Sequence, residues 1–281
     1  MHTITRLIAT STLSSCLAAG ALADTAPFPI AGGGDTYVFT AIGPWSNEHC
    51  HHSNSVDLEL ADLLQGATDE ASCLLDDARF ADASAEVGFL LDEDGFTAAF
   101  GGQGHAEGAE TFNRHDVNTD LELGFSVDTR LRVDWTMEAG GLGSAGFQMR
   151  RLGDIGGELD VSPAVIDRSI SSYIEPLSEQ GQDVVFIPAG RWNLRMISNH
   201  QASGDWEEGF QQSWSECTHI ATIVALGDVD GDGVVGVADL LDVIAHWGVV
   251  EADDADARLA DLDDNDTIDV DDLLRVISDW G

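Results

Sequence analysis

Apolar and polar residues alternate one by one through much of the chain between residues 35 and 225. A period of two places successive side chains on opposite faces of an extended strand, so that one face is buried and the other meets solvent. The clearest runs have apolar residues at Leu121, Leu123, Phe125 and Val127, at Leu131, Val133, Trp135 and Met137, and at Trp192, Leu194 and Met196. Helical periodicity is almost absent here. The pattern predicts half-buried antiparallel strands.

Turn signals separate the predicted strands. These turns are Glu93-Asp94-Gly95, Gly101-Gly102, Ala139-Gly140-Gly141, Gly156-Gly157 and Pro188-Ala189-Gly190. Short strands at this spacing predict a mostly β domain over residues 24–225, an antiparallel β-sandwich of the jelly-roll type. Residues 56–65 fit either a strand or a short helix. The layout resembles secreted bacterial β-sandwich domains, including carbohydrate-binding ones.

The pattern changes after residue 226, where a unit of loop plus short apolar helix occurs twice. Residues 228–239 and 261–272 align at a constant separation of 33 residues. The alignment continues beyond the loops and pairs Leu240-Leu241 with Leu273-Leu274, Val243-Ile244 with Val276-Ile277, and Trp247-Gly248 with Trp280-Gly281. A solvated acidic tail would not repeat apolar residues at helical offsets. We therefore predict a folded module over residues 226–281, with both tryptophans in its core.

Each repeat begins with a loop whose acidic spacing is that of a calcium site. Calcium takes six to eight oxygen ligands, and such a loop supplies them from positions 1, 3, 5, 7, 9 and 12. The ligands predicted in the first loop are Asp228, Asp230, Asp232, the carbonyl of Val234, a water beside Gly236, and Asp239. Those in the second loop are Asp261, Asp263, Asn265, the carbonyl of Thr267, Asp269 (directly or through water) and Asp272. We therefore expect two Ca²⁺ ions as cofactors.

Position 6 of such a loop turns sharply, which suits glycine. The first loop has Gly233 there, whereas the second has Asp266, which tolerates a left-handed backbone less well than glycine. The second site is therefore expected to be the weaker one. A unit this small buries little apolar surface, and its ligand carboxylates repel one another, so we expect it to fold only on binding calcium.

Both loops end in Asp followed by Leu-Leu, and no long helix precedes the first loop. The common EF-hand loop ends instead in a bidentate Glu. These features of residues 226–281 resemble the type I dockerin module, a duplicated EF-hand-like calcium unit. The resemblance implies an all-α fold with pseudo-twofold symmetry, two calcium ions and a face that docks a cohesin domain. In that family, loop positions 10 and 11 influence partner choice and are often Ser or Thr.

The residues at those two positions here are Val237 and Ala238 in one half and Val270 and Asp271 in the other. They differ from the usual pattern of the family, so the docking partner stays open between a cohesin-like protein and a cell-surface component. Leu226 is followed at once by the loop that starts at Asp228, without a Pro/Ser-rich spacer. The module is therefore expected to pack on the sandwich.

The N-terminus has the pattern of an export signal. Arg6 precedes an apolar or small stretch over residues 7–20, and Ala21-Leu22-Ala23 predicts cleavage after Ala23. An alternative is a lipoprotein box at Leu13-Ser14-Ser15-Cys16, which would leave a lipidated Cys16. The apolar stretch is too short for a membrane span. Both interpretations predict a secreted or cell-surface protein.

The formal net charge is −39, and all 12 basic residues are Arg. Nucleic acid and anionic membranes are disfavoured as partners, because no basic patch could neutralise phosphates. Calcium, cationic or neutral surfaces, and uncharged ligands such as polysaccharide are the partners that fit this charge. Three cysteines follow the predicted cleavage site, and Cys50–Cys73 is the obvious local disulfide, with Cys217 left over. Their spacing alone does not fix the pairing.

Candidate sites in the large domain are weaker. His49-Cys50-His51-His52 is dense in ligand atoms, but adjacent residues of an extended chain point to opposite faces, which favours a plain loop with a disulfide cysteine. Trp45, Trp206 and Trp214 could stack on sugars, whereas Trp135 and Trp192 are expected in the core. No spacing singles out a catalytic carboxyl pair; Asp205, Glu207 and Glu208, around Trp206, are the nearest candidates.

Two functions remain. The favoured one is an exported, non-catalytic calcium-binding protein, whose dockerin-like module mediates docking or assembly and whose β-sandwich binds a surface or polysaccharide. The alternative is a secreted polysaccharide-active enzyme, a glycoside hydrolase or lyase, that carries the module as a tail.

Overall fold

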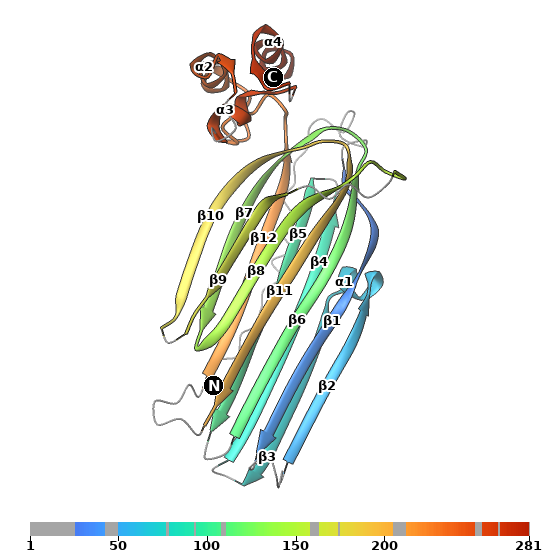
Figure 1. The fold of residues 1–281 in the computed structure, drawn as a ribbon, viewed down its shortest axis with the longest axis vertical. Coiled ribbons are helices and arrows are strands. Elements are labelled where there is room, and N and C mark those ends of the chain that lie inside the picture. Colours follow the sequence, from blue (N-terminus) through green and yellow to red (C-terminus); the bar gives the residue numbers. More distant parts are fainter. Residues whose placement is uncertain are drawn as a thin grey trace.

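Two facing β-sheets make up most of the molecule, and short helices follow at its C-terminal end (Figure 1). The computed structural model describes residues 26–42, 50–76, 79–92, 94–107, 111–157, 163–173, 175–204, 212–250, 255–263 and 265–280. The prediction of a mostly β, antiparallel sandwich is confirmed. The predicted signal peptide, residues 1–23 with Cys16, lies outside the described residues.

Each sheet has six strands, and neighbouring strands are antiparallel throughout. Sheet A has the order β2-β1-β6-β11-β8-β9 and contains β1 Phe28–Ile42, β2 Cys50–Glu59, β6 Thr111–Phe125, β8 Leu142–Gly153, β9 Ala164–Ser171 and β11 Gly190–Ser203. Sheet B has the order β10-β7-β12-β5-β4-β3 and contains β3 Ala67–Asp76, β4 Arg79–Asp92, β5 Gly95–Glu107, β7 Thr129–Gly140, β10 Leu177–Ile187 and β12 Gln212–Val224.

The eight strands from β5 to β12 have the order of a jelly roll. The row β10-β7-β12-β5 belongs to sheet B and the row β6-β11-β8-β9 to sheet A. Every connection among these strands crosses from one sheet to the other, except the one between β8 and β9. Strands that alternate between two sheets in this way form the paired Greek keys of a jelly roll, in agreement with the prediction. β1 and β2 extend sheet A, and β3 and β4 extend sheet B.

The alternation of the sequence puts one face of each sheet into a shared core. Trp192 is 1% exposed, and its Nε1 donates to the carbonyl of Pro188 at 3.1 Å. Trp135 packs against the edge of this core and is only partly buried. The predicted inward positions that are buried include Leu121, Leu123, Phe125, Leu131, Val133, Met137, Leu194 and Met196. Val127 is an exception: it follows the end of β6 and is exposed.

Part of the interior is polar. His115 of β6 and His200 of β11 contact each other through their Nδ1 atoms, and His115 Nε2 lies 3.1 Å from Ser198 Oγ. Burial lowers the pKa of His115 to about 3, and burial together with His115 lowers the pKa of His200 well below its usual value. A Cβ at Gly104 of β5 would lie 2.4 Å from His200 Nε2, so glycine makes room for this imidazole. Both histidines are therefore neutral at pH 7.

The ambiguous segment over residues 56–65 contains both elements: β2 ends at Glu59, and helix α1 spans Leu60–Gln65. Cys73 is disulfide-bonded, whereas Cys217 is free and buried, as expected for the cysteine left over. The side chain of Cys50 lies outside the described residues, as do His49 and the side chains of His51 and His52.

The C-terminal segment has three short helices, α2 Val237–Ala245, α3 Ala255–Ala260 and α4 Val270–Asp279. Between them, β13 Gly248–Val249 pairs with β14 Thr267–Ile268, so a purely helical module is not what the structure shows. A core of its own is formed by Val229, Val235, Val243, Val250, Ala257, Ala260, Leu262, Ile268 and Val276. No helix of the described residues is long and apolar enough to cross a membrane.

This segment packs on the end of the sandwich, as the missing spacer led us to expect. Arg130 of β7 donates to the carbonyl of Asp228 at 3.0 Å, and α3 lies next to β10. Figure 1 shows the helices beyond the end of β12, the strand that leads into the first loop.

Candidate functional site

Three aspartates converge in the first C-terminal loop. Asp228, Asp230 and Asp232 each offer a carboxylate oxygen, and these atoms lie within 4.8 Å of one another. Asp228 is 1% exposed; its Oδ2 accepts from the backbone N–H of Gly233 at 2.9 Å, but its Oδ1 has no partner among the described residues. A buried acceptor without a partner costs free energy, so this oxygen is suited to a cation.

Three aspartates also converge in the second loop, with the third at position 12 instead of position 5. Carboxylate oxygens of Asp261, Asp263 and Asp272 lie within 4.8 Å of one another. Asp261 accepts from the backbone N–H groups of Asn265 at 3.1 Å and Asp266 at 2.8 Å. Asp266 has φ 61°, and Gly233 at the same position of the first loop has φ 89°. The predicted left-handed turn at position 6 is therefore present in both loops.

The aspartates at position 12 fasten each loop to the helix that follows. Asp239 Oδ1 accepts from Val229 N at 2.6 Å, and its Oδ2 accepts from Gly236 N at 2.7 Å. Asp272 makes the same two bonds, to Leu262 N at 2.6 Å and Asp269 N at 2.7 Å. Both carboxylates are fully buried, yet only Asp272 belongs to a converging group.

The other predicted ligands take different places. Asp269 caps α4, where its carboxylate accepts from Asp271 N at 2.8 Å. Thr267 pairs with Val249 in the small ladder, and Val234 is exposed. Gly236 is the residue before α2, and Asn265 is exposed in the second loop. The structure thus gathers the carboxylates of positions 1 and 3 in both loops, together with position 5 of the first and position 12 of the second.

Burial and crowding raise the pKa of carboxyl groups in both loops. Burial raises the pKa of Asp228, and the charges of Asp239 and Asp230 raise it further, against the opposing hydrogen bond from Gly233. Burial also raises the pKa of Asp230 and of Asp261, and neighbouring carboxylates add to both shifts. A positive ion among these oxygens would reverse the effect.

The outward faces of α2 and α4 are apolar in both repeats. The exposed pairs, each separated by 33 residues, are Val237 and Val270, Leu241 and Leu274, Ile244 and Ile277, and Trp247 and Trp280. Trp247 is 53% and Trp280 45% exposed, so their predicted place in the core was wrong. Val243 and Val276 fill the core instead, and each tryptophan comes after the last residue of its helix. Ala238 and Asp271, the other partner positions, are exposed too.

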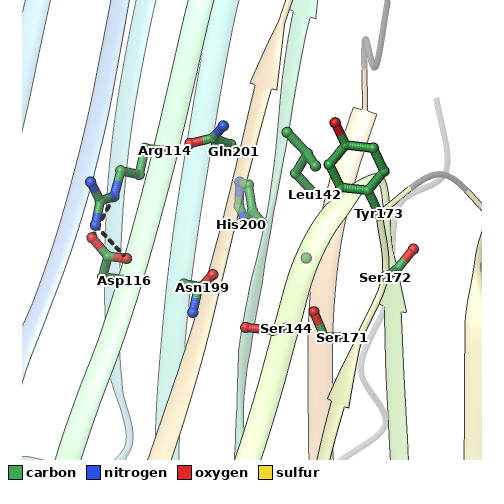
Figure 2. A pocket seen from close by; sticks show the side chains of 11 residues that line it. Arg114, Asp116, Leu142, Ser144, Ser171, Ser172, Tyr173, Asn199, His200 and Gln201 are labelled. Carbon is green, nitrogen blue, oxygen red and sulfur yellow. Dashed lines mark hydrogen bonds and ion pairs between the residues drawn. The ribbon is translucent and has the colours of Figure 1, made fainter.

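A polar hollow of about 380 Å³ lies on the outer face of sheet A (Figure 2). Strand register builds its floor in two rows. One row places Asp116 opposite Asn199, Asn199 opposite Ser144, and Ser144 opposite Ser171. The other places Arg114 opposite Gln201, and Gln201 opposite Leu142. Four strands, β6, β11, β8 and β9, therefore contribute side chains to one surface.

The charged side chains of this hollow are paired, and its other polar side chains are neutral. Arg114 and Asp116 neutralise each other through contacts of 3.2 Å (Nη2 to Oδ1) and 2.8 Å (Nε to Oδ2). Asn199 and Gln201 each offer an amide donor and acceptor. Tyr173 is 64% exposed and stands at the side of the hollow in Figure 2. The sequence did not predict these residues as a site, because every half-exposed strand has polar residues at its outward positions.

Sheet B has a second candidate surface on its outer face. A hollow of about 410 Å³ is lined there by Asp134, Trp135, Thr136, Gln180, Gly181, Gln182, Thr218 and Ile220. Trp214 of β12 alternates with buried residues and is half-buried, on the outward side, where a Cβ on Gly140 would lie 2.4 Å from its ring. Trp45, Trp206, Asp205, Glu207 and Glu208 lie outside the described residues.

No family model matches the sequence, and no curated protein matches it. Solved structures show only distant similarity. The carbohydrate-binding module TmCBM61 in complex with β-1,4-galactotriose has a TM-score of 0.22 and 10% identity, over 42% of this chain and 74% of that chain. The enzymatically active domain of bacteriophage CBA120 tailspike protein 4 has a TM-score of 0.23 and 8% identity, over 57% and 19%. Arthrobacter globiformis T6 isomalto-dextranase complexed with panose has a TM-score of 0.19 and 10% identity, over 69% and 32%. Similarity at this level assigns neither a family nor a function.

Proposed function

We propose that this chain is an exported, non-catalytic calcium-binding protein, in which the C-terminal module docks a partner and the β-sandwich binds polysaccharide. The observation that carries the proposal is that aspartates at positions 1 and 3 converge with a third aspartate in both loops, and that Asp239 and Asp272 at position 12 make the same paired hydrogen bonds. Each half of the proposal has its own support, and each can be tested separately.

Calcium fits the loops better than other common ions. The donors are carboxylate oxygens without nearby thiols or imidazoles among the described residues, which favours a hard cation. The unpartnered Oδ1 of Asp228 supplies a buried acceptor at position 1 of the first loop. We propose one Ca²⁺ in each loop, held by the aspartates at positions 1 and 3 with the further ligands expected from the loop spacing. The ion would neutralise carboxylates that otherwise repel one another.

A dockerin-like role is supported by the exposed apolar face of α2 and α4. Large apolar side chains that stay exposed in matched positions of both repeats mark an interaction surface. Residues 226–281 hold 16 Asp and one Glu against two Arg, so a second copy of this module would be repelled. The partner we propose is a protein with an apolar groove bordered by basic residues, on a cell surface or a scaffold.

Polysaccharide binding is supported by the chemistry of the hollow on sheet A. A sugar presents hydroxyl groups that both donate and accept, which amide side chains such as Asn199 and Gln201 can match. The Arg114–Asp116 pair supplies further donors and acceptors at no net charge. Tyr173 adds a ring face that a sugar can contact. An uncharged glycan suits a chain of net charge −39 better than an acidic one.

Two measurements test the proposal. Calorimetric titration of the calcium-free protein should give two ions per chain, and no uptake of calcium would reject the first half. A glycan array should give binding that the double variant N199A/Q201A loses by roughly tenfold or more, since truncation leaves hydroxyl partners unmatched. Gln180→Ala in the hollow of sheet B is the matched control and should leave binding unchanged. Equal binding by the double variant would reject the hollow.

The enzyme alternative has less support in the described residues. A glycosidase requires two carboxyl groups about 5 to 9.5 Å apart around the scissile bond. Asp116 is the sole carboxyl among the residues that line the hollow of sheet A, and it is paired with Arg114. Asp134 is likewise the sole one in the hollow of sheet B, where Arg132 pairs with it at 3.3 Å. Cleavage of any glycan bound on the array would favour the enzyme instead.

Export is supported by the disulfide of Cys73, because such bonds persist in oxidising compartments. We propose that the mature protein begins after Ala23 and is secreted or held at the cell surface. Mass spectrometry of the exported protein would distinguish this start from a lipidated Cys16.

A further inference from the structure

One buried arginine of the sandwich holds both repeats of the C-terminal module. Arg130 of β7 is fully buried; its Nη1 donates to the carbonyl of Asp228 at 3.0 Å, and its Nη2 donates to the carbonyl of Leu259 at 2.6 Å. Asp228 opens the first loop, whereas Leu259 lies in α3, two residues before the second loop begins. A single guanidinium thus joins backbone from both halves of the repeat.

A second arginine holds the first loop from the same strand. Arg132 Nη1 donates to the carbonyl of Gly231 at 3.3 Å, while its Nε pairs with Asp134 at 3.3 Å on the sandwich side. Gly231 has φ 71°, and a Cβ there would lie 2.5 Å from Val184 Cγ2 of β10. The first loop therefore lies directly against the strands of sheet B.

The guanidinium of Arg130 finds its hydrogen-bond acceptors in the module. A guanidinium stays protonated in proteins, so Arg130 brings a buried positive charge to this contact. A buried cation is costly unless its donors are satisfied, and the acceptors of its Nη1 and Nη2 atoms are both carbonyls of the module. If the loops opened, the side chain of Arg130 would stay at the end of the sandwich without these two acceptors.

We infer that Arg130 and Arg132 couple calcium binding in the module to the stability of the sandwich. Calcium closes the loop that begins at Asp228, and the closed loop presents the carbonyls that Arg130 and Arg132 require. Coupling of this kind is reciprocal, so an intact sandwich also favours calcium in the module by the same free energy. The module is thereby a stabilising part of the β-domain and not an independent domain joined to it by a linker. This inference rests on the proposed calcium binding, but not on polysaccharide binding or docking.

Cys217 supplies a probe for the sandwich alone. It is free and fully buried in the sandwich core, and residues 226–281 contain no cysteine. Iodoacetamide labelling of Cys217, located by mass spectrometry during a temperature ramp, therefore reports opening of the sandwich. The ramp would be run on the full chain in excess calcium and in EGTA. Equilibrium dialysis would count bound calcium in the same samples.

The wild-type protein should label at a temperature several degrees higher in calcium than in EGTA. Arg130→Met should lose most of this shift, and Arg130→Lys should too, because an ammonium keeps the charge but not the planar fork. Arg132→Met should lose part of it, which provides a test if the Arg130 variants do not fold. Arg150→Met is the matched control on β8, where Arg150 donates to Gln148, and it should keep the full shift.

Two results would overturn the coupling. One is a wild-type labelling temperature that is equal in calcium and EGTA while two ions bind. The other is a full shift in the Arg130→Met or Arg132→Met variant. A wild-type chain that binds no calcium would instead reject the proposed calcium sites, and the coupling with them.

Discussion

The sandwich and the C-terminal module differ in the side chains that they bury and expose. The sandwich buries large apolar side chains such as Trp192 and Phe147 between its sheets and exposes polar rows on its outer faces. The module buries carboxylates, with Asp239 and Asp272 fully enclosed, and exposes the apolar side chains of Leu241 and Leu274. The module thus combines a small apolar core with buried carboxylates, whereas the larger sandwich core is mainly apolar.

The difference follows from size. The sandwich core draws on all twelve strands of the two sheets, so it can bury enough apolar area to offset the entropy of ordering the chain. The module core consists of nine buried aliphatic side chains, and none of them is aromatic. An interior this small commonly needs a metal or a disulfide to be stable. Four predictions test whether the two regions really differ in this way.

The largest effect is expected from removing calcium. In EGTA, backbone amides of residues 226–281 should exchange with solvent deuterium at nearly the unprotected rate, because uncompensated aspartates oppose closure of both loops. Amides of β4 and β6 should stay protected, since their core contains no proposed ion site. Hydrogen exchange with mass spectrometry measures both regions in one sample.

Magnesium serves as the control in that experiment. It demands octahedral geometry and dehydrates reluctantly, so it should restore less protection than calcium at equal concentration. Unchanged protection of α2 and α4 in EGTA would show that the module is stable without an ion. The contrast between the two regions would then be wrong.

The second prediction compares two tryptophans. Trp192→Ala should lower the free energy of unfolding of the sandwich by about 3–5 kcal/mol, because it removes a large side chain that is 1% exposed. Trp280→Ala is the matched control in the module and should change stability by less than about 0.5 kcal/mol, since its side chain is 45% exposed. Urea unfolding in calcium measures both. A larger loss of unfolding free energy from Trp280→Ala would show that Trp280 belongs to the module core, as the sequence predicted.

The sequence predicted the two regions by different signals. Alternation identified β6, β7 and β11 because their inward residues, such as Leu121 and Leu194, are buried on one side only. It could not identify β10, whose first six residues are all exposed at the edge of sheet B. In the module, the repeat of 33 residues located the loops, but not the direction of Trp247, which depends on where α2 ends.

The candidate sites divide in the same way. Ligand spacing within one loop is local, so Asp228, Asp230 and Asp232 could be grouped from the sequence alone. The hollow on sheet A depends on the pairing of Asn199 with both Asp116 and Ser144, which are far apart in the chain. Arg130 likewise gave no signal, because its partners are backbone carbonyls that only the packed structure brings close.

The third prediction uses acid to destabilise the sandwich. Burial lowers the pKa of His115 and of His219 to about 3, whereas each titrates near 6.5 when unfolded. The unfolded chain therefore binds more protons below pH 6.5, so stability present at pH 7 is lost as the pH falls toward 3. Between pH 7 and 5.5 the loss should be roughly 1 kcal/mol for each buried histidine. Urea unfolding at the two pH values gives the slope.

His219→Phe isolates this effect. The imidazole of His219 stacks on Phe147 with ring centroids 3.8 Å apart, so phenylalanine can keep that contact while it removes one titrating group. With His200 also neutral and buried, the variant should reduce the pH-dependent loss by about one third. An unchanged slope would mean that groups outside the sandwich interior cause the acid sensitivity.

The smallest effect concerns one backbone position in the module. Asp266→Gly should stabilise the calcium-bound module by roughly 1 kcal/mol, because Asp266 has φ 61° and glycine adopts a positive φ without steric cost. Its backbone N–H, which bonds Asp261 at 2.8 Å, is retained in the variant. Gly233→Asp is the reciprocal change in the first loop, where φ is 89°, and should weaken that site. Calcium titration of both variants measures the two sites against each other. If neither variant shifts calcium affinity, the strain at position 6 is too small to make the second site the weaker one. Any difference in affinity between the two sites must then come from Arg130 and Arg132, which contact the first loop but not the second.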